Sequence, residues 1–316
     1  QGWQDKGGLD ALNTRIQADP GDAAAYHDRA QIYLRAGKMN EALRDIGRAL
    51  EIRPDAPAFL ITLSDIYFGL QQPQKTRETL LKVLDLDPMN TNAMLKLAEF
   101  SLYHRDYAGV ESYAQRALNV DPNLAQAYFI LGFASKEKGD TTQAIRFFMQ
   151  TADRDPQYFE AFMQLGILHA ALRDPLAEKY YERALSLQPE SVEVLYNMGL
   201  YYQENEFYNE ALETYHRIIL LEPGFRLAYY NLGYIHMVYL GVYQEAVKYF
   251  TQALEVDPGY VEALYNRGYA YELIGDVLNA RADYQKALQI RPNYPMAVAG
   301  LNRLDELDRA AGGNRP

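Results

Sequence analysis

The side chains that most often carry chemistry are few in this chain, and their spacing does not suit catalysis. The absence of cysteine excludes disulfides, thiolate metal sites and thiol nucleophiles. The chain has five histidines, none with the His-x-x-x-His spacing that binds a metal ion from one face of a helix. These are His27, His104, His169, His216 and His236. Two of them, His169 and His236, occur at a position where other parts of the chain have tyrosine, so we interpret them as packing residues.

Nucleotide-binding and hydrolase motifs are absent as well. The stretch "GFASKEKGD" at 132–140 lacks the Gly-Lys-Ser/Thr ending of a phosphate-binding loop. There is no Gly-x-Ser-x-Gly nucleophile elbow. The carboxylates mostly occupy exposed helical positions or Asp-Pro turns. We therefore expect no enzyme activity, no cofactor and no metal site.

One motif suits recognition rather than catalysis. An asparagine follows a tyrosine in "LYNMG" at 195–199, "YYNLG" at 229–233 and "LYNRG" at 264–268. An asparagine amide is both a donor and an acceptor of hydrogen bonds, and tyrosine offers a large contact area with a polar tip. The three copies begin 34 and 35 residues apart, which indicates an internal repeat.

Composition limits the classes of protein that fit. The 316 residues have a formal net charge of −11, which argues against nucleic-acid binding. No run of about 18 apolar residues predicts a membrane span, and no basic run suits an anionic membrane surface. The first residues, "QGWQDKGGLD", lack an initiating Met and a signal-peptide core, which fits a processed N-terminus or an artificial boundary. We expect a soluble acidic protein, and its compartment stays open between the cytoplasm and a bacterial periplasm, where it would be a lipoprotein.

Proline marks the period of the chain. Nine prolines recur at intervals of 34 residues, with one interval of 33 and one of 35. Because proline lacks an N–H and clashes with the preceding turn, each of them stops a helix. They are Pro20, Pro54, Pro88, Pro122, Pro156, Pro189, Pro223, Pro258 and Pro292.

Each period contains two helical patterns separated by a short turn. In 261–292, "IGD" at 274–276 interrupts the spacing typical of a helix face, and Gly275 suits a helix C-terminus. A column of small residues recurs in the first helix: Ala30, Ser64, Ala98, Gly132, Gly166, Gly199, Gly233 and Gly268. Since glycine inside a helix costs about 0.5–1 kcal/mol relative to alanine, the column predicts close helix packing there.

These columns, with the closing proline, resemble the tetratricopeptide repeat. The resemblance implies an all-α, right-handed α-solenoid superhelix in which the first helix of each pair lines the concave face. We expect one solenoid domain, 1–310, with a helix at 9–22, a capping helix at 295–309 and a disordered tail at 310–316. The eight full repeats are 23–56, 57–90, 91–124, 125–158, 159–191, 192–225, 226–260 and 261–294. The seventh contains an extra residue within "MVYLGVYQEA".

The expected concave stripe is apolar or aromatic from Phe129 onward and more polar before it. An exposed apolar strip of that length is unusual on a monomer without a partner. The predicted peptide-binding residues are Tyr196, Asn197, Tyr230, Asn231, Tyr234, Tyr265, Asn266, Tyr269, Phe129, Phe133, Glu193 and Glu262. The asparagines partly resemble the ladder of O-linked N-acetylglucosamine transferases, which implies bonds to a peptide backbone. Because Glu160 and Glu272 also lie near this face, we expect a neutral or basic ligand rather than an acidic one.

The sequence therefore predicts a protein–protein interaction scaffold that holds an extended or helical segment of a partner. Two alternatives stay open. The chain could be the substrate-recruiting part of a larger, glycosyltransferase-like enzyme, or a structural subunit of a bacterial envelope or secretion assembly. Self-association through the aromatic groove is also compatible with the pattern.

Overall fold

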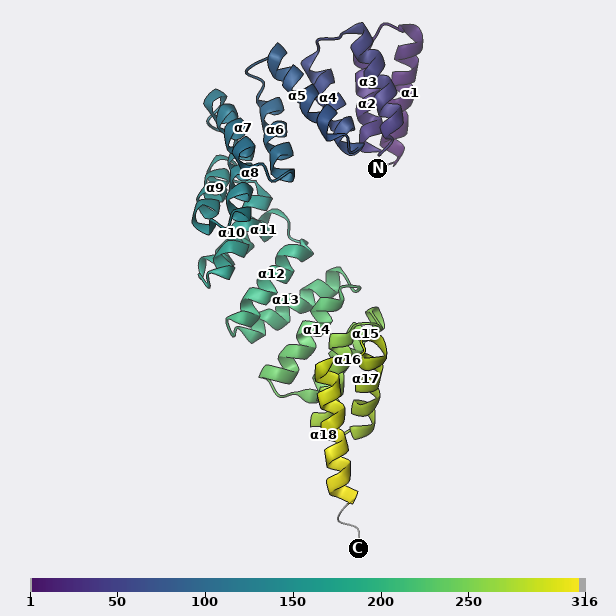
Figure 1. Ribbon diagram of the computed structural model, residues 1–316, viewed down its shortest axis with the longest axis vertical. Coiled ribbons are helices and arrows are strands. Elements are labelled where there is room, and N and C mark those ends of the chain that lie inside the picture. Colours follow the sequence, from purple (N-terminus) through teal and green to yellow (C-terminus); the bar gives the residue numbers. More distant parts are fainter. Residues whose placement is uncertain (1, 313–316) are drawn as a thin grey trace. The chain divides into compact units, whose positions relative to one another are not determined.

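The computed structural model describes residues 2–312, and within that range every regular element is helical (Figure 1). The expected all-α fold is confirmed. The contacts between Cα atoms divide the chain into two units, residues 1–161 and 162–316.

The first unit consists of a single helix followed by pairs of helices. They are α1 (Gly2–Ala18), α2 (Ala23–Arg35), α3 (Met39–Ile52), α4 (Pro57–Gly69), α5 (Pro73–Leu86), α6 (Thr91–Tyr103), α7 (Tyr107–Val120), α8 (Ala125–Glu137) and α9 (Thr141–Arg154). Each pair corresponds to one predicted repeat. Asp22, Asn90, Asp106 and Asp140 cap four of these helices by accepting a hydrogen bond from a first-turn N–H.

The second unit continues the pattern and ends in one long helix. Its helices are α10 (Phe159–Ala171), α11 (Leu176–Leu187), α12 (Val192–Glu204), α13 (Tyr208–Leu221), α14 (Arg226–Tyr234), the π-helix η1 (Ile235–Tyr239), α15 (Tyr243–Val256), α16 (Val261–Leu273), α17 (Val277–Ile290) and α18 (Pro295–Gly312). In the expected disordered tail, residues 310–312 are helical, consistent with the high helix propensity of the alanines at 310 and 311. Residues 313–316 lie outside the described part of the chain.

The small-residue column packs as predicted, and the structure shows what it faces. A Cβ added to Gly199 would lie 2.7 Å from the ring of Tyr215, and one added to Gly166 would lie 2.6 Å from the ring of Tyr181. Both rings are buried. The glycines of α8, α14 and α16 meet buried rings in the same way. An aromatic side chain of the second helix therefore fills the space that each glycine leaves.

The extra residue of the seventh repeat is accommodated in η1. A π-helical turn takes one more residue than an α-helical turn, so the insertion is absorbed at the end of the first helix. Gly241 follows with a φ of +67°, which returns the chain to α15.

The first and last full repeats contain a buried ion pair at positions where the other repeats have no charged residue. Arg29 donates two hydrogen bonds to Asp45, at 2.6 and 2.8 Å. Arg267 does the same to Asp283, at 2.8 and 2.7 Å. The seventh repeat has Leu232 and Tyr249 at the corresponding positions. Each pair joins the two helices of its repeat.

Candidate functional site

The first helices of the second unit carry a face of tyrosines. The rings of Tyr230 and Tyr234, one turn apart on α14, are stacked with their centroids 6.3 Å apart. Those of Tyr265 and Tyr269 on α16 are nearly parallel, at 6.2 Å and 2°. Because i and i+4 lie on the same side of a helix, both pairs expose ring surface in one direction. We call these four residues, together with Tyr196 on α12, the tyrosine face.

Aromatic residues in the turns between repeats cover one side of these rings. Tyr260 lies 5.1 Å from Tyr230, and Tyr294 lies 5.9 Å from Tyr265, centroid to centroid. Phe225 approaches Tyr196 at 5.3 Å. This row of aromatic residues was not predicted from the sequence, although each member follows the repeat's closing proline by two residues. The tyrosine face is therefore half-buried, and each exposed ring is held in place by a second aromatic side chain.

The three asparagines are in different environments. Asn266 is buried and donates from Nδ2 to the hydroxyl of Tyr230, at 2.9 Å. Asn197 donates to the Glu193 carbonyl of its own helix, also at 2.9 Å. Burial raises the pKa of the Tyr215 phenol, and the buried side-chain amide of Asn231 acts to lower it. The asparagines therefore do not form a uniform row of amides.

Burial also shifts the pKa of phenols at this site. Loss of solvation raises the pKa of Tyr230 to about 12, against a smaller opposing effect of the Asn266 amide. Burial raises the pKa of the Tyr265 phenol, whereas Arg303 on α18 acts to lower it. Both side chains stay protonated and neutral at physiological pH. They offer aromatic surface and hydroxyl groups, not charge.

Arginines neutralise part of the acidic charge near the tyrosine face. Arg303 donates two hydrogen bonds to Glu272, both at 2.8 Å, and its guanidinium lies 5.4 Å from the ring of Tyr269. Glu262 accepts a bond from Arg291 at 2.8 Å. Glu193 is exposed. The carboxylate charge at this face is therefore smaller than the sequence suggests.

Phe129 and Phe133 belong to a separate cluster in the first unit. Their ring centroids are 4.9 Å apart on α8, and both rings contact the buried Phe148. Tyr158, another residue two positions after a proline, covers Phe129 at 4.7 Å. The cluster repeats the packing of the tyrosine face with fewer hydroxyl groups.

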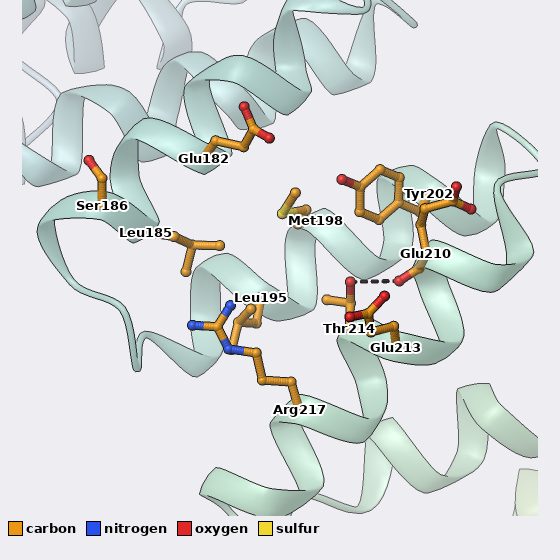
Figure 2. Close-up of a pocket in the computed structure, with 10 residues that line it drawn as sticks. All are labelled: Glu182, Leu185, Ser186, Leu195, Met198, Tyr202, Glu210, Glu213, Thr214 and Arg217. Carbon is orange, nitrogen blue, oxygen red and sulfur yellow. Dashed lines mark hydrogen bonds between the residues drawn. The ribbon is translucent and has the colours of Figure 1, made fainter.

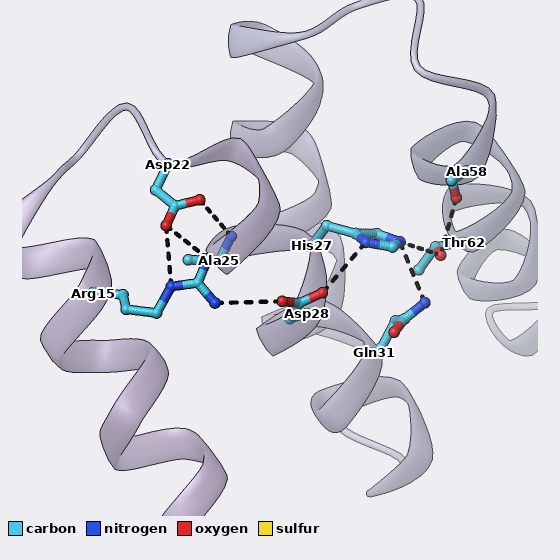
Figure 3. A network of polar contacts seen from close by, with 8 residues as sticks. All are labelled: Arg15, Asp22, Ala25, His27, Asp28, Gln31, Ala58 and Thr62. Carbon is cyan, nitrogen blue, oxygen red and sulfur yellow. Dashed lines mark hydrogen bonds and ion pairs between the residues drawn. The ribbon is translucent and has the colours of Figure 1, made fainter.

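The equivalent positions at the start of the chain are polar, as expected. His27 Nε2 and Thr62 Oγ1 share a hydrogen bond at 2.9 Å, and the Gln31 side-chain amide lies 3.3 Å from the same ring nitrogen (Figure 3). Burial lowers the pKa of His27, and the nearby Asp28 partly offsets this effect. Lys96 of the third repeat forms an ion pair with Asp65, at 2.7 Å. These groups bond with one another and present no aromatic surface comparable to the tyrosine face.

Stacked helix pairs with a recurring glycine–aromatic contact define the chain as an all-α helical repeat solenoid. Three family models, each described as a tetratricopeptide repeat, match residues 23–56, 125–158 and 237–295. The chain is a tetratricopeptide-repeat protein with many repeats. This architecture is generally that of a non-catalytic scaffold for protein interactions.

Relatives of this chain are distant. The protein CTR9 homolog of Arabidopsis thaliana is 25% identical over 271 residues, which are 71% of this chain and 25% of that protein. The human protein O-mannosyl-transferase TMTC3 is 24% identical over 191 residues, 59% of this chain and 21% of that protein. The crystal structure of the APC/C hetero-tetramer Cut9-Hcn1 contains a chain with a TM-score of 0.50 and 19% identity, covering 94% of this chain and 58% of that one. The chain therefore spans a quarter or less of the length of the two curated relatives.

No helix in the described part of the chain is both long and apolar enough to cross a membrane.

Proposed function

We propose that this protein is an interaction scaffold whose tyrosine face binds an extended or helical segment of a partner protein. The observation that carries the proposal is the pair of stacked tyrosine ladders on α14 and α16, each held by an aromatic residue from the following turn. Rigid aromatic side chains offer contact area at a small cost in conformational entropy. Tyrosine is also enriched among the residues that dominate binding energy at protein interfaces.

Within this proposal, the buried asparagine amide and the tyrosine rings have different roles. Asn266 supports Tyr230 through a hydrogen bond, so it positions a ring rather than contacting the ligand first. The ring surfaces of Tyr234 and Tyr269 are the primary contacts. Fully burying an exposed aromatic side chain contributes about 1.5–3 kcal/mol, and each of these half-buried rings contributes a part of that amount. Since Glu193 is exposed and two neighbouring carboxylates are paired, we propose a neutral or weakly basic ligand.

A peptide selection tests this function. A random peptide library displayed on phage is panned on the full chain, and the selected peptides are then measured against Tyr234→Ala combined with Tyr269→Ala. We expect this double variant to lose at least tenfold in affinity. Tyr103→Ala is the matched control, because Tyr103 is a highly exposed tyrosine that belongs to α6 and not to either ladder. Peptides that bind the double variant as well as the wild type would refute the proposal.

One observation favours a second candidate function. A curated relative named as an O-mannosyl-transferase contains the matching region as 21% of its length. In that case the tyrosine face would recruit the substrate of a catalytic domain elsewhere in a longer protein. Sequencing the complete gene distinguishes the two, since only this second function needs a catalytic domain in the same chain.

A further inference from the structure

Outside the tyrosine face, one column of the second helices differs between repeats. Four repeats have an aromatic residue there, and the first and last have the aspartates of the buried ion pairs. The second and sixth repeats have threonine instead. The column is Asp45, Thr79, Tyr113, Phe147, Tyr180, Thr214, Tyr249 and Asp283.

A pocket of about 490 Å³ lies beside Thr214, lined by residues of α11, α12 and α13 (Figure 2). Leu185, Leu195 and Met198 provide its apolar surface. Glu182 contributes a carboxylate from α11. The Thr214 hydroxyl already donates to a backbone carbonyl on its own helix, at 2.7 Å.

The next repeat shows why the pocket is open. There, Tyr249 takes the position of Thr214, and its ring lies 5.2 Å from His236, which corresponds to Tyr202. His216 Nδ1 donates to the Leu212 carbonyl, so its Nε2 accepts a hydrogen bond from the Tyr249 hydroxyl, at 2.9 Å. His216 corresponds to Glu182. In this repeat a tyrosine ring therefore occupies the space that threonine leaves empty.

The second repeat, which also has threonine in this column, contains a similar pocket with a different charge at its rim. A pocket of about 500 Å³ beside Thr79 is lined by Leu60 and Leu63, the counterparts of Leu195 and Met198. Its rim includes Lys75 and Lys82. Both pockets lie where a threonine replaces an aromatic side chain, but only the Thr214 pocket has more carboxylates than cationic groups at its rim.

Charge indicates what the Thr214 pocket accepts. Its rim contains three carboxylates, from Glu182, Glu210 and Glu213, and one guanidinium, from Arg217. The Arg217 guanidinium already donates a hydrogen bond to the Pro189 carbonyl. An apolar surface below a carboxylate rim fits a side chain with an aliphatic stem and a cationic end.

We propose that this pocket binds an arginine or lysine side chain of a partner protein. The stem packs against Leu195 and Met198, and the cation meets the carboxylates of the rim. None of the residues that line the pocket belongs to the tyrosine face, so this inference does not rest on the proposed function of that face. It predicts a second contact point for a basic partner.

Methionine-methyl NMR on the full chain tests this site directly. The probe is N-acetylarginine methylamide, and the neutral citrulline analogue is the control of matched shape. We expect the Met198 methyl resonance, assigned with Met198→Leu, to shift saturably with the arginine probe, with a dissociation constant on the order of 1–10 mM. The citrulline analogue should leave it unchanged. Met163, which on α10 takes the position of Tyr196, should not respond to the arginine probe.

Two substitutions complete the design. Thr214→Tyr introduces the residue found in the next repeat, so it should fill the pocket, keep the fold and abolish the shift. Thr79→Tyr is the matched control and should leave the Met198 response unchanged. The proposal is overturned if Met198 does not respond, if citrulline shifts it equally, or if Thr214→Tyr retains the shift. A response at Met163 alone would also overturn it, while leaving the tyrosine face as a binding surface.

Discussion

The side-chain amide of Asn266 donates a hydrogen bond to the hydroxyl of Tyr230, across the interface between the seventh and eighth repeats. The sequence suggested two independent contacts for a ligand. In the structure they are one unit, because the amide is buried and the ring it supports faces outward beside Tyr234. The position of the Tyr230 ring in the tyrosine face therefore depends on how the eighth repeat packs against the seventh.

This bond predicts a difference between two neighbouring tyrosines. Tyr230→Phe leaves the buried Asn266 amide without an acceptor and should lower the free energy of unfolding by about 1–2 kcal/mol. Tyr234→Phe removes a hydroxyl from the same helix face, where no such bond exists, and should change stability by less than about 0.5 kcal/mol. Urea unfolding followed by circular dichroism measures both. Equal effects would mean that the Asn266 bond does not contribute.

Two glycines in helices should respond to alanine with opposite signs. Gly199→Ala places a methyl group against the buried Tyr215 ring and should destabilise the fold by about 1–3 kcal/mol. Apart from its chain neighbours and the backbone of its own helix, no atom lies within 4 Å of a Cβ added to Gly47 on α3, so Gly47→Ala should stabilise the fold by about 0.5–1 kcal/mol. Urea midpoints of the two variants check this. A stabilising Gly199→Ala would show that the glycine column is not required for close packing.

Replacing both Arg267 and Asp283 should preserve stability, whereas replacing only Arg267 should not. Arg267→Leu alone leaves an unpaired buried carboxylate and should cost about 3–5 kcal/mol. Combined with Asp283→Tyr, it reproduces the Leu232 and Tyr249 arrangement of the preceding repeat, and we expect stability within about 1 kcal/mol of the wild type. A double-mutant cycle in urea measures the coupling. If the stability losses of the two single variants add up in the double variant, the predicted coupling between Arg267 and Asp283 is wrong.

His27 should make the first unit sensitive to mild acid. Burial lowers its pKa in the folded state below the value of about 6.5 in the unfolded chain. The unfolded state therefore binds more protons in this range, and stability is lost as the pH falls through about 6.5 toward the folded pKa. Urea midpoints between pH 7.5 and 5.5 should fall less for His27→Gln than for the wild type. His104→Gln, at an exposed histidine, is the control and should keep the wild-type slope.

Much of the fold could be predicted because its determinants are local. Prolines at intervals of 34 residues stop helices wherever they occur, and Gly275 ends a helix through its own backbone freedom, with a φ of +82°. The small-residue column likewise indicated close packing before its partner rings were known. The small-residue column has eight members, so a preference that is weak at one position becomes recognisable as a pattern.

The details of the sites could not be predicted, because they depend on which side chains from different repeats meet. Helix periodicity places Tyr230 and Asn231 near one face, but only the stacking of α14 on α16 decides that Asn266 bonds to Tyr230. Nothing in the helical pattern of α18 shows that Arg303 pairs with Glu272 beside Tyr269. The pocket at Thr214 follows from one missing ring, which is visible only when the neighbouring helices are in place. Sequence determined the repeat, because its rules act within a few residues; tertiary structure decided the surfaces, because burial and pairing are properties of contacts between repeats.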